Sequence, residues 1–453
     1  MKSLYSNLNL MSMVSALNEH FAAYFHEATR PMRSLLCGIV LAMLAFESIP
    51  SIRWMHRRFH LSLMPGSLNS YYRALKTCTV DDSSWVSHTI RRALSAIPSD
   101  LADAPLFLSV DDTIVAKAGQ CFDFVSKLFD HAMHTGSAYV NGHCFVSLML
   151  SVPVDKDMKG GCSGGIHYLH VPVVYCLWTK EKTKLEMAAD AIDAVMRDLE
   201  GKHIVVLCDS WYPKKKFISR ILSHENADII CNVRVDTAIY DLPPARTGKR
   251  GRPCKRGAQL SLDDFACTYS RGKFKVGHRC VKTKILGDIT VHAYVTVSES
   301  GARRLFICTA EPSEIRFGCA SHTDDPNTTV GDTDREFLPL SLYSIRWNIE
   351  VGYYEHKTFW SLGRYMLRRR CGIERLLNLI CMAHASMRLL PYVDTRFARF
   401  KECSPQEVRM AISKQIQDEL FLSRLADEAS NTINSADVLS VLRDVVKHWN
   451  NAA

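Results

Sequence analysis

The stretch Leu342–Arg370, LYSIRWNIEVGYYEHKTFWSLGRYMLRRR, concentrates charged and aromatic residues in a pattern that predicts one helix. At 100° per residue, four of its side chains project within roughly 60° of one another. They are Tyr343, Arg346, Glu350 and Lys357. A solvated helix face would explain any one of them. A carboxylate that holds a metal, beside cations that hold a phosphate, better explains the aligned set and the arginines that follow it. The stretch therefore predicts phosphoryl-transfer chemistry, with partners elsewhere in the chain.

Length and composition indicate a folded protein with more than one domain. The chain has 453 residues, of which 47% are hydrophobic and 23% charged, values typical of globular proteins. The formal charge of +9 is modest for this length. It favours a polyanionic partner only where basic residues cluster.

The cysteines favour a reduced, intracellular protein. Sixteen of them are spread along the chain without any CxxC pair, and many lie in apolar runs. Such cysteines pack as small hydrophobic residues, which argues against both a disulfide scaffold and a structural zinc site. No signal peptide is expected, and the apolar run Leu35–Phe46 is too short to span a bilayer. We expect a soluble, cytoplasmic protein.

Residues 1–104 predict a helical DNA-binding region. Two short helical segments, Ser51–Phe59 and Ser67–Lys76, flank a turn at Pro65-Gly66. The second segment carries Asn, Tyr, Arg and Lys, as a helix-turn-helix reader of DNA would. An ordinary helical hairpin is the alternative, and the sequence leaves it open.

Residues 105–235 predict a mixed sheet with helices on its faces. Leu106–Val110 is an apolar run expected to end in a polar tip, Asp111-Asp112-Thr113. A later strand, His203–Cys208, ends on Asp209. Between them the sequence predicts two more strands and a helix, at Cys144–Leu150, Ile166–Leu177 and about 182–200. This alternation of strands and helices is typical of an α/β core.

Residues 236–339 predict a mostly β insertion that opens with a basic arm. The segment Arg246–Arg256, RTGKRGRPCKR, has six basic residues in eleven positions. Its core, Arg250-Gly-Arg-Pro253, resembles an AT-hook that inserts arginines into a minor groove. We expect Lys249, Arg250 and Arg252 to bind DNA, and a charged flexible loop is the alternative. Residues 340–400 would complete the core, and residues 401–453 form a C-terminal helical region.

Three carboxylates could form one metal site. Asp111 (or its neighbour Asp112), Asp209 and Glu350 come from distant parts of the chain. An aspartate at a strand end can be merely a turn residue or a helix cap. Together, however, the three acids fit two Mg²⁺ ions about 4 Å apart, or Mn²⁺ in their place, which clamp the oxygens of a phosphoryl transfer.

These residues resemble those of the bacterial insertion-sequence transposases of the DDE superfamily, in the family with a YREK signature and a β-rich insertion before the glutamate. That signature, Y-x2-R-x3-E-x6-K, matches the four helix residues named above without departure. The aspartates match in Asp111-Asp112-Thr113 and Leu207-Cys208-Asp209-Ser210. The resemblance extends over about residues 105–390. Because the family's first aspartate precedes a residue and then threonine, it favours Asp111 over Asp112.

The resemblance implies a fold, a reaction and partners. The fold is α/β, an RNase H-like core interrupted by the β insertion, with helical regions at both ends. Asp111, Asp209 and Glu350 would bind two Mg²⁺ ions, so that metal-activated water cuts each transposon end and the freed 3′-hydroxyl attacks target DNA. Tyr343, Arg346 and Lys357 would contact DNA phosphates. A homodimer on double-stranded DNA and a nucleoid-associated, bacterial location are implied as well.

One departure concerns the route of excision. Relatives that cut through a hairpin use a tryptophan of the insertion to hold a flipped base, and residues 236–339 contain none. Another aromatic face could stack on a base instead. The candidates are Tyr240, Phe265, Tyr269, Phe274, Tyr294, Phe306 and Phe317.

Two alternative functions remain from the sequence. One is a catalytically inactive or domesticated transposase-derived DNA-binding protein, although all three carboxylates are present. The other is an RNase H-like nuclease that cuts without strand transfer.

Overall fold

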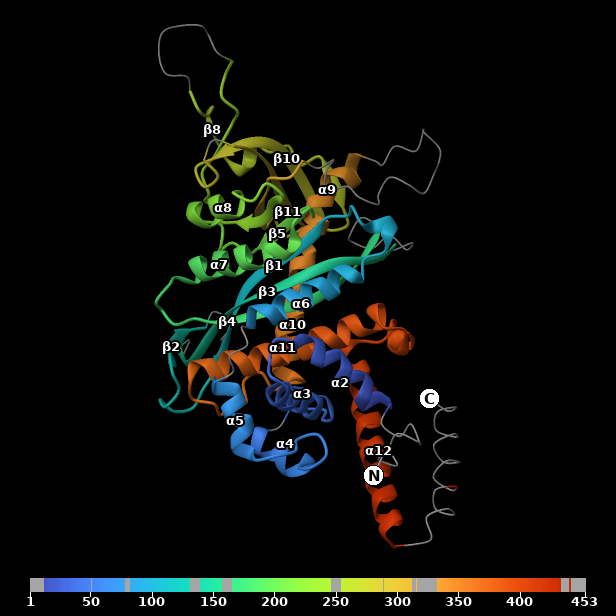
Figure 1. The fold of residues 1–453 in the computed structure, drawn as a ribbon. Coiled ribbons are helices and arrows are strands. Elements are labelled where there is room, and N and C mark those ends of the chain that lie inside the picture. Colours follow the sequence, from blue (N-terminus) through green and yellow to red (C-terminus); the bar gives the residue numbers. More distant parts are fainter. Residues whose placement is uncertain are drawn as a thin grey trace. The chain divides into compact units, whose positions relative to one another are not determined.

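The computed structural model describes residues 12–49, 51–77, 82–130, 139–156, 165–245, 254–287, 289–311, 315, 332–432 and 440. The chain forms two compact units (Figure 1). The first comprises Met1–His88, Gly119–Asp123 and Glu355–Ala453 and is helical. The second comprises Thr89–Ala118 and Phe124–Tyr354 and contains the sheet.

Five strands form the mixed sheet of the core, and all but the last lie where the sequence predicts a strand. They are β1 (Leu106–Ala116), β3 (Tyr139–Lys156), β4 (Ile166–Leu177), β5 (Ile204–Cys208) and β6 (Ala227–Val233). Antiparallel pairing joins β4 to β3 and β3 to β1, and parallel pairing joins β1 to β5 and β5 to β6. A short strand, β2 (Ser126–Phe129), pairs with the start of β3 on the same edge as β4. The order β4-β3-β1-β5-β6 is that of an RNase H-like core, so the predicted α/β fold class is confirmed.

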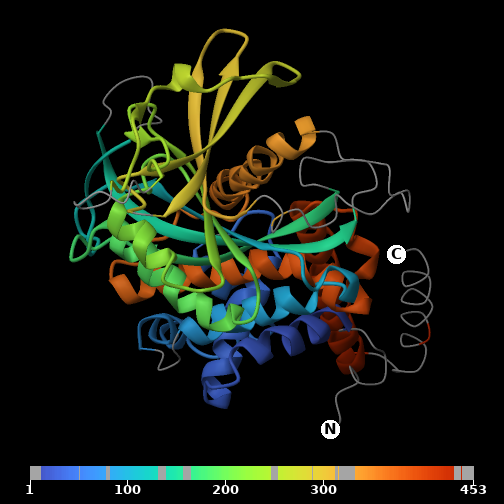
Figure 2. The same cartoon turned by 90° about the horizontal axis from the view of Figure 1, so that it is seen from above.

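The insertion is mostly β and continues the same sheet. Its strands are β7 (Ile239–Tyr240), β8 (Gln259–Leu260), β9 (Tyr269–Arg271), β10 (Phe274–Thr283), β11 (Thr290–Ser298) and β12 (Arg303–Cys308). The last of these, β12, lies antiparallel to β6 and adds the insertion to the edge of the core sheet. Figure 2 shows β10 and β11 as the long yellow strands that rise from that edge.

One hydrophobic core joins the insertion to the core strands. Phe107 of β1 and Leu207 of β5 belong to the same buried cluster as Phe306 of β12. Leu342 and Ile345, from the segment that follows the insertion, complete its cover. Because these side chains share one core, the insertion is packed into the sheet unit and is not an independent module.

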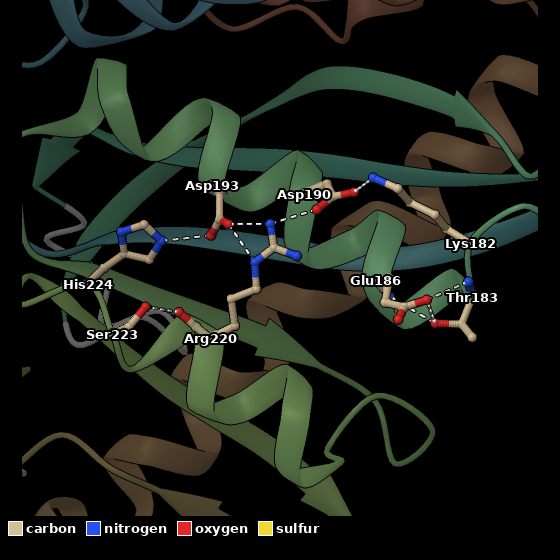
Figure 3. Close-up of polar contacts among 8 residues, drawn as sticks. All are labelled: Lys182, Thr183, Glu186, Asp190, Asp193, Arg220, Ser223 and His224. Carbon is tan, nitrogen blue, oxygen red and sulfur yellow. Dashed lines mark hydrogen bonds and ion pairs between the residues drawn. The ribbon is translucent and has the colours of Figure 1, made fainter.

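Two helices of the sheet unit, α7 (Lys184–Met196) and α8 (Lys215–Ile221), are held together by an ionic network (Figure 3). Arg220 of α8 lies 2.6 Å from Asp190 and 2.5 Å from Asp193, both on α7. His224 Nε2 lies 2.8 Å from Asp193 Oδ1, and Lys182 Nζ lies 2.6 Å from Asp190 Oδ2. A network of several charges fixes geometry better than an isolated surface pair does. A 3₁₀ turn, η2 (Arg197–Leu199), follows α7.

The single helix predicted over Leu342–Arg370 is wrong in its continuity. The structure has α9 (Asp332–Tyr343), a 3₁₀ turn η4 (Ser344–Arg346) and α10 (Trp347–Thr358), and the next helix begins at Arg370. After α10, Ser361 has a φ of 54° and the Leu362 amide donates to the His356 carbonyl at 3.0 Å. A residue in the left-handed conformation, with a backbone hydrogen bond that closes back over the last turn, commonly ends a helix.

The helical unit contains α2 (Ser12–Tyr24), α3 (Arg30–Leu44), α4 (Ile52–Phe59), α5 (Leu68–Thr77), α11 (Arg370–Val393) and α12 (Pro405–Thr432). Another N-terminal helix, α6 (Asp82–Ser95), contains the division of the chain between the two units. Short 3₁₀ turns lie at Ser99–Leu101, Leu262–Asp264 and Thr395–Phe400. The helices predicted at both ends of the chain are therefore present.

Within the described residues, α11 alone is long and apolar enough to cross a membrane, and 78% of its most apolar window is buried inside the protein. Burial of this kind is expected of a core helix. In the same unit, the fully buried Arg409 of α12 connects that helix to α3. The Arg409 guanidinium donates to the carbonyls of Met43 and Phe46 at the end of α3.

Candidate active site

Asp111 and Asp209 lie side by side where two parallel strands part. The last register pair between β1 and β5 is Val110 with Cys208, and each aspartate is the next residue on its own strand or just beyond it. The predicted polar tip at Asp111 is wrong, because β1 continues to Ala116. Pairing with β3 carries it past that point, from Asp111 opposite Ser147 to Ala116 opposite Gly142.

The face of the sheet that carries Asp111 also carries α10. Neighbouring residues of a strand point to opposite faces, and register partners point to the same face. Ser147, the partner of Asp111, is hydrogen-bonded through its hydroxyl to the Tyr353 hydroxyl of α10 at 2.6 Å. At the residue before Tyr353, a Cβ added to Gly352 would lie 2.6 Å from Met149 Cε, the flexible end of that side chain. Gly352 of α10 therefore packs against the Met149 side chain of β3.

Arg346 joins the carboxylate of β1 to the carboxylate of α10. Its Nη1 lies 3.2 Å from Asp111 Oδ2, and its Nη2 lies 2.5 Å from Glu350 Oε1. The side chains of Arg346 and Asp111 are only 12% and 17% exposed, whereas that of Glu350 is 34% exposed. Arg346 and Glu350 are four residues apart, a spacing that brings side chains together on a helical surface. Two residues predicted for the site are thus in direct contact with a third.

The carboxylates are crowded enough to disturb their ionisation. Burial and the negative charge of Asp209 together raise the pKa of Asp111 to about 7, against the opposing effect of Arg346. The effect of Asp209 on this pKa reflects its closeness to Asp111. When a neighbouring carboxylate disfavours the charged form of a carboxyl group, a bound cation would stabilise both negative charges. The donor set fits a hard divalent cation, which prefers carboxylate oxygens.

Asp112 belongs to a different set of contacts on the opposite face. Lys184 Nζ lies 2.8 Å from Asp112 Oδ2, and the Cys144 thiol donates to the same oxygen at 3.3 Å. The Tyr212 hydroxyl donates to Asp112 Oδ1 at 3.3 Å. Since these groups already engage Asp112, its neighbour Asp111 is the better candidate for a metal ligand.

Lys184 is a site residue that the sequence analysis missed. It is the first residue of α7, and it also lies 4.9 Å from the centre of the Trp211 ring. Its position is fixed by the capping box of Thr183 and Glu186, drawn in Figure 3. The motif Thr-x-x-Glu was a readable signal for the helix start. The sequence could not reveal that the helix start faces Asp112.

The other predicted DNA-binding residues differ in how they are placed. Tyr343 is half-buried, and its ring packs edge-on against Phe306 with centroids 5.0 Å apart. Burial raises the pKa of its hydroxyl. Lys357 lies on α10, as predicted, in the last turn. Lys249, Arg250 and Arg252 lie outside the described residues, as does Phe317.

Part of the sheet unit is similar to a known protein family. Residues 178–270 match the family described as "DDE superfamily endonuclease". The matched segment is roughly a fifth of the chain. It contains Lys184 and Asp209, while Asp111 and Glu350 lie outside it. No curated protein matches the sequence.

Solved structures with related arrangements include two transposase complexes. The cryo-EM structure of the piggyBac transposase synaptic complex with hairpin DNA has a TM-score of 0.40 and 11% sequence identity, and the alignment covers 99% of this chain and 85% of that one. The Drosophila P element transposase strand transfer complex has a TM-score of 0.23 and 10% identity, with 84% and 91% covered.

Proposed function

We propose that this protein is a metal-dependent DNA endonuclease of the DDE type, which acts as the transposase of an insertion sequence. The proposal is supported by the placement of acids from distant parts of the chain. Asp111 and Asp209 leave the same pair of parallel strands, and Arg346 ties Asp111 to Glu350. The family match over residues 178–270 supports the same reaction class.

Asp111, Asp209 and Glu350 would hold the metal ions. Two Mg²⁺ or Mn²⁺ ions bound there would supply Lewis acidity for hydrolysis of a phosphodiester. The protein's own part is to concentrate negative charge on a partly buried surface and to fix it there. The Tyr353–Ser147 hydrogen bond anchors the helix that carries Glu350 to β3.

Arg346 would have a second role once Asp111 and Glu350 bind metal ions in place of its guanidinium. Its guanidinium presents planar donors suited to a phosphate oxygen, as Arg–phosphate pairs generally do. Lys357, on the same helix, would contact the DNA backbone, and Tyr343 would position Arg346, since its ring centre lies 5.8 Å from that guanidinium. The basic residues Lys249, Arg250 and Arg252 would add sequence-independent affinity.

DNA would also be bound by the pair α4 and α5. Ile52, Met55 and Phe59 of α4 are buried, so the helix turns its polar side outward. The exposed basic residues of the pair are Arg53, Arg57, Arg58, Arg73 and Lys76. A positive helical surface beside a short turn is suited to the DNA backbone and groove. In the strand-transfer reaction the protein would act as a homodimer that bridges two DNA ends.

The experiment is cleavage of linear DNA that contains the sequences flanking the coding region, with Mg²⁺ and the full-length protein. Asp209→Ala and Glu350→Ala should abolish end cleavage, with a loss of at least a thousandfold, and should still bind the DNA. Asp103→Ala, which changes an exposed aspartate in the turn before β1, is the matched control and should cut normally. Undiminished cleavage by either site variant would refute the proposal.

The same reaction distinguishes a transposase from a nuclease that only cuts. A transposase joins the cleaved 3′ ends to an added target plasmid, and a simple nuclease leaves them free. Joined products that depend on Glu350 are the expected result.

A further inference from the structure

The β insertion contains a cluster of nitrogen and sulfur ligands that the proposed function does not use. His278 and Cys280 are alternate residues of β10, so both point to one face of the strand. His292 of β11 is the register partner of Cys280 and points to the same face. The three side chains can place their ligand atoms within 4.8 Å of one another.

We propose that His278, Cys280 and His292 bind one Zn²⁺ ion. The ligand atoms are His278 Nε2, His292 Nδ1 and Cys280 Sγ, which are borderline or soft donors of the kind that zinc prefers. His292 Nδ1 lies 3.7 Å from Cys280 Sγ and 2.9 Å from His278 Nε2. Tetrahedral zinc with its usual bond lengths requires about 3.6 Å between nitrogen and sulfur and about 3.4 Å between two nitrogens. A shift of roughly half an ångström at one imidazole therefore completes the geometry.

The residues around the cluster already hold both imidazoles in the orientation that a metal needs. Glu311 Oε2 lies 3.4 Å from His292 Nε2, the ring nitrogen opposite the proposed ligand atom. A carboxylate there keeps the proton on Nε2, so that the Nδ1 lone pair faces His278 and Cys280 and can coordinate, which is the usual partner arrangement of a zinc-bound histidine. The ring of Tyr294 stacks on that of His278, with centroids 4.5 Å apart and planes 10° apart. This stacking holds the His278 imidazole in place.

Binding requires one proton to leave the cluster. The Cys280 thiol loses its proton to solvent and coordinates as a thiolate, and both imidazoles coordinate in their neutral form, that of His278 after its ring proton has moved from Nε2 to Nδ1. Three protein ligands leave a fourth position for water. The site is open on one side, because Cys280 is exposed, and closed on the other, because His292 is only 8% exposed. The ion would fasten β10 to β11 and, through Glu311, to the segment that follows β12.

This site is chemically distinct from the three carboxylates of the proposed active site. Mg²⁺ prefers oxygen ligands and binds thiolate and imidazole poorly, so the two sites select different ions. The sequence analysis argued against zinc because no CxxC pair is present. The pattern His-x-Cys on one strand, completed by a histidine across a hairpin, escapes that search, because β pairing and not sequence spacing brings the ligands together.

The test is a titration of the full-length, metal-free protein with Co²⁺, which substitutes for zinc and has a thiolate-to-metal charge-transfer absorption. We expect that absorption to saturate at one ion per chain and to vanish when Zn²⁺ is added. Cys280→Ser should remove it, and Glu311→Gln should weaken Co²⁺ binding by about tenfold, as loss of a partner carboxylate typically does.

Two controls make the result decisive. Cys254→Ser changes another exposed cysteine of the insertion and should leave the absorption intact. Asp209→Ala should also leave it intact, which separates this site from the proposed function. Because Cys280 is exposed, its serine variant should fold, and circular dichroism checks that it does. A charge-transfer band that persists in folded Cys280→Ser, or no band in the parent protein, would overturn the proposal.

Discussion

Arg346 lies between two carboxylates and so competes with any cation that those carboxylates bind. Its contacts with Asp111 and Glu350 neutralise part of an acidic cluster in which burial and the charge of Asp209 raise the pKa of Asp111 to about 7. A metal ion that takes the same oxygens must displace the guanidinium. Arg346 therefore stabilises the metal-free protein and weakens its affinity for metal at the same time.

Arg346→Gln should separate these two effects. Without metal, the variant should lose about 1–3 kcal/mol of unfolding free energy, because an ion pair that is largely buried loses one partner. Added Mg²⁺ should raise its melting temperature more than it raises that of the parent, since ligand binding to the folded state is stabilising. Thermal unfolding across a Mg²⁺ series measures both.

Arg220→Gln is the matched control for that series. Arg220 also pairs with two carboxylates, Asp190 and Asp193. Neither of them is one of the three acids of the proposed metal site. Its loss should lower the melting temperature without changing the response to Mg²⁺. If Arg346→Gln responds to Mg²⁺ as the parent does, Arg346 does not compete with the metal.

At the scale of elements, the end of α10 depends on one strained residue. Ser361 has a φ of 54°, a left-handed conformation that costs a non-glycine residue roughly 1–2 kcal/mol. Its hydroxyl is buried and has no hydrogen-bond partner among the described residues. The side chain therefore contributes little to offset the backbone strain.

Ser361→Gly should raise the free energy of unfolding by about 1 kcal/mol, because glycine adopts positive φ without a steric penalty. Chemical denaturation of parent and variant measures the change. Ser361→Ala removes the same hydroxyl but keeps the Cβ, so it should give no gain. A destabilised Ser361→Gly would show that the greater chain entropy of unfolded glycine outweighs the relieved strain.

Elements were predictable from the sequence to the extent that local pattern decides them. The strand predicted at Ile166–Leu177 is β4 with the same bounds. The interruption at Ser344–Arg346 was not predictable, because the charge pattern of the YREK stretch continues through it. The extension of β1 past Asp111 follows from pairing with β3, a contact between distant residues that no local pattern contains.

At the scale of the whole molecule, the helical unit has a buried polar cluster that links its stability to pH. His384 Nε2 lies 3.0 Å from Glu355 Oε2, and Arg388 Nη2 lies 2.6 Å from the same oxygen. Burial lowers the pKa of His384 to about 4. The pKa of Glu355 is lowered to about 2, because its bonds to His384 and Arg388 outweigh the opposing effect of burial.

Both shifts predict a unit that loses stability in acid. Between pH 6.5 and about 4 the unfolded chain binds a proton at His384 that the folded chain does not, so stability falls as the pH falls. Below about pH 4.5 Glu355 adds to the loss in the same way. Urea unfolding at pH 7.5 and pH 5 should show a decrease that His384→Gln reduces by about 1–2 kcal/mol. The exposed-histidine variant His167→Gln should keep the full decrease, and equal decreases in both variants would contradict this origin.

The candidate site was predictable in its residues but not in its arrangement. Motif spacing singled out Asp111, Asp209, Arg346 and Glu350, and the structure brings Asp111, Arg346 and Glu350 into contact. Lys184 was missed because its role depends on the orientation of α7, and the His278–Cys280–His292 cluster was missed because a hairpin register creates it. Site residues that belong to one sequence motif can be predicted from the sequence. Site residues that strand pairing or helix packing brings together can be found only in the structure.

The central claim is that Asp111, Asp209 and Glu350 together hold divalent cations, and equilibrium binding of Mn²⁺ followed by electron paramagnetic resonance tests it most directly. The parent should bind two Mn²⁺ ions per chain, and Asp111→Asn, Asp209→Asn and Glu350→Gln should each lose at least one of them. Asp112→Asn should retain both, because Lys184, Cys144 and Tyr212 engage that residue instead. Full Mn²⁺ occupancy in all three site variants, or its loss in Asp112→Asn alone, would contradict the account.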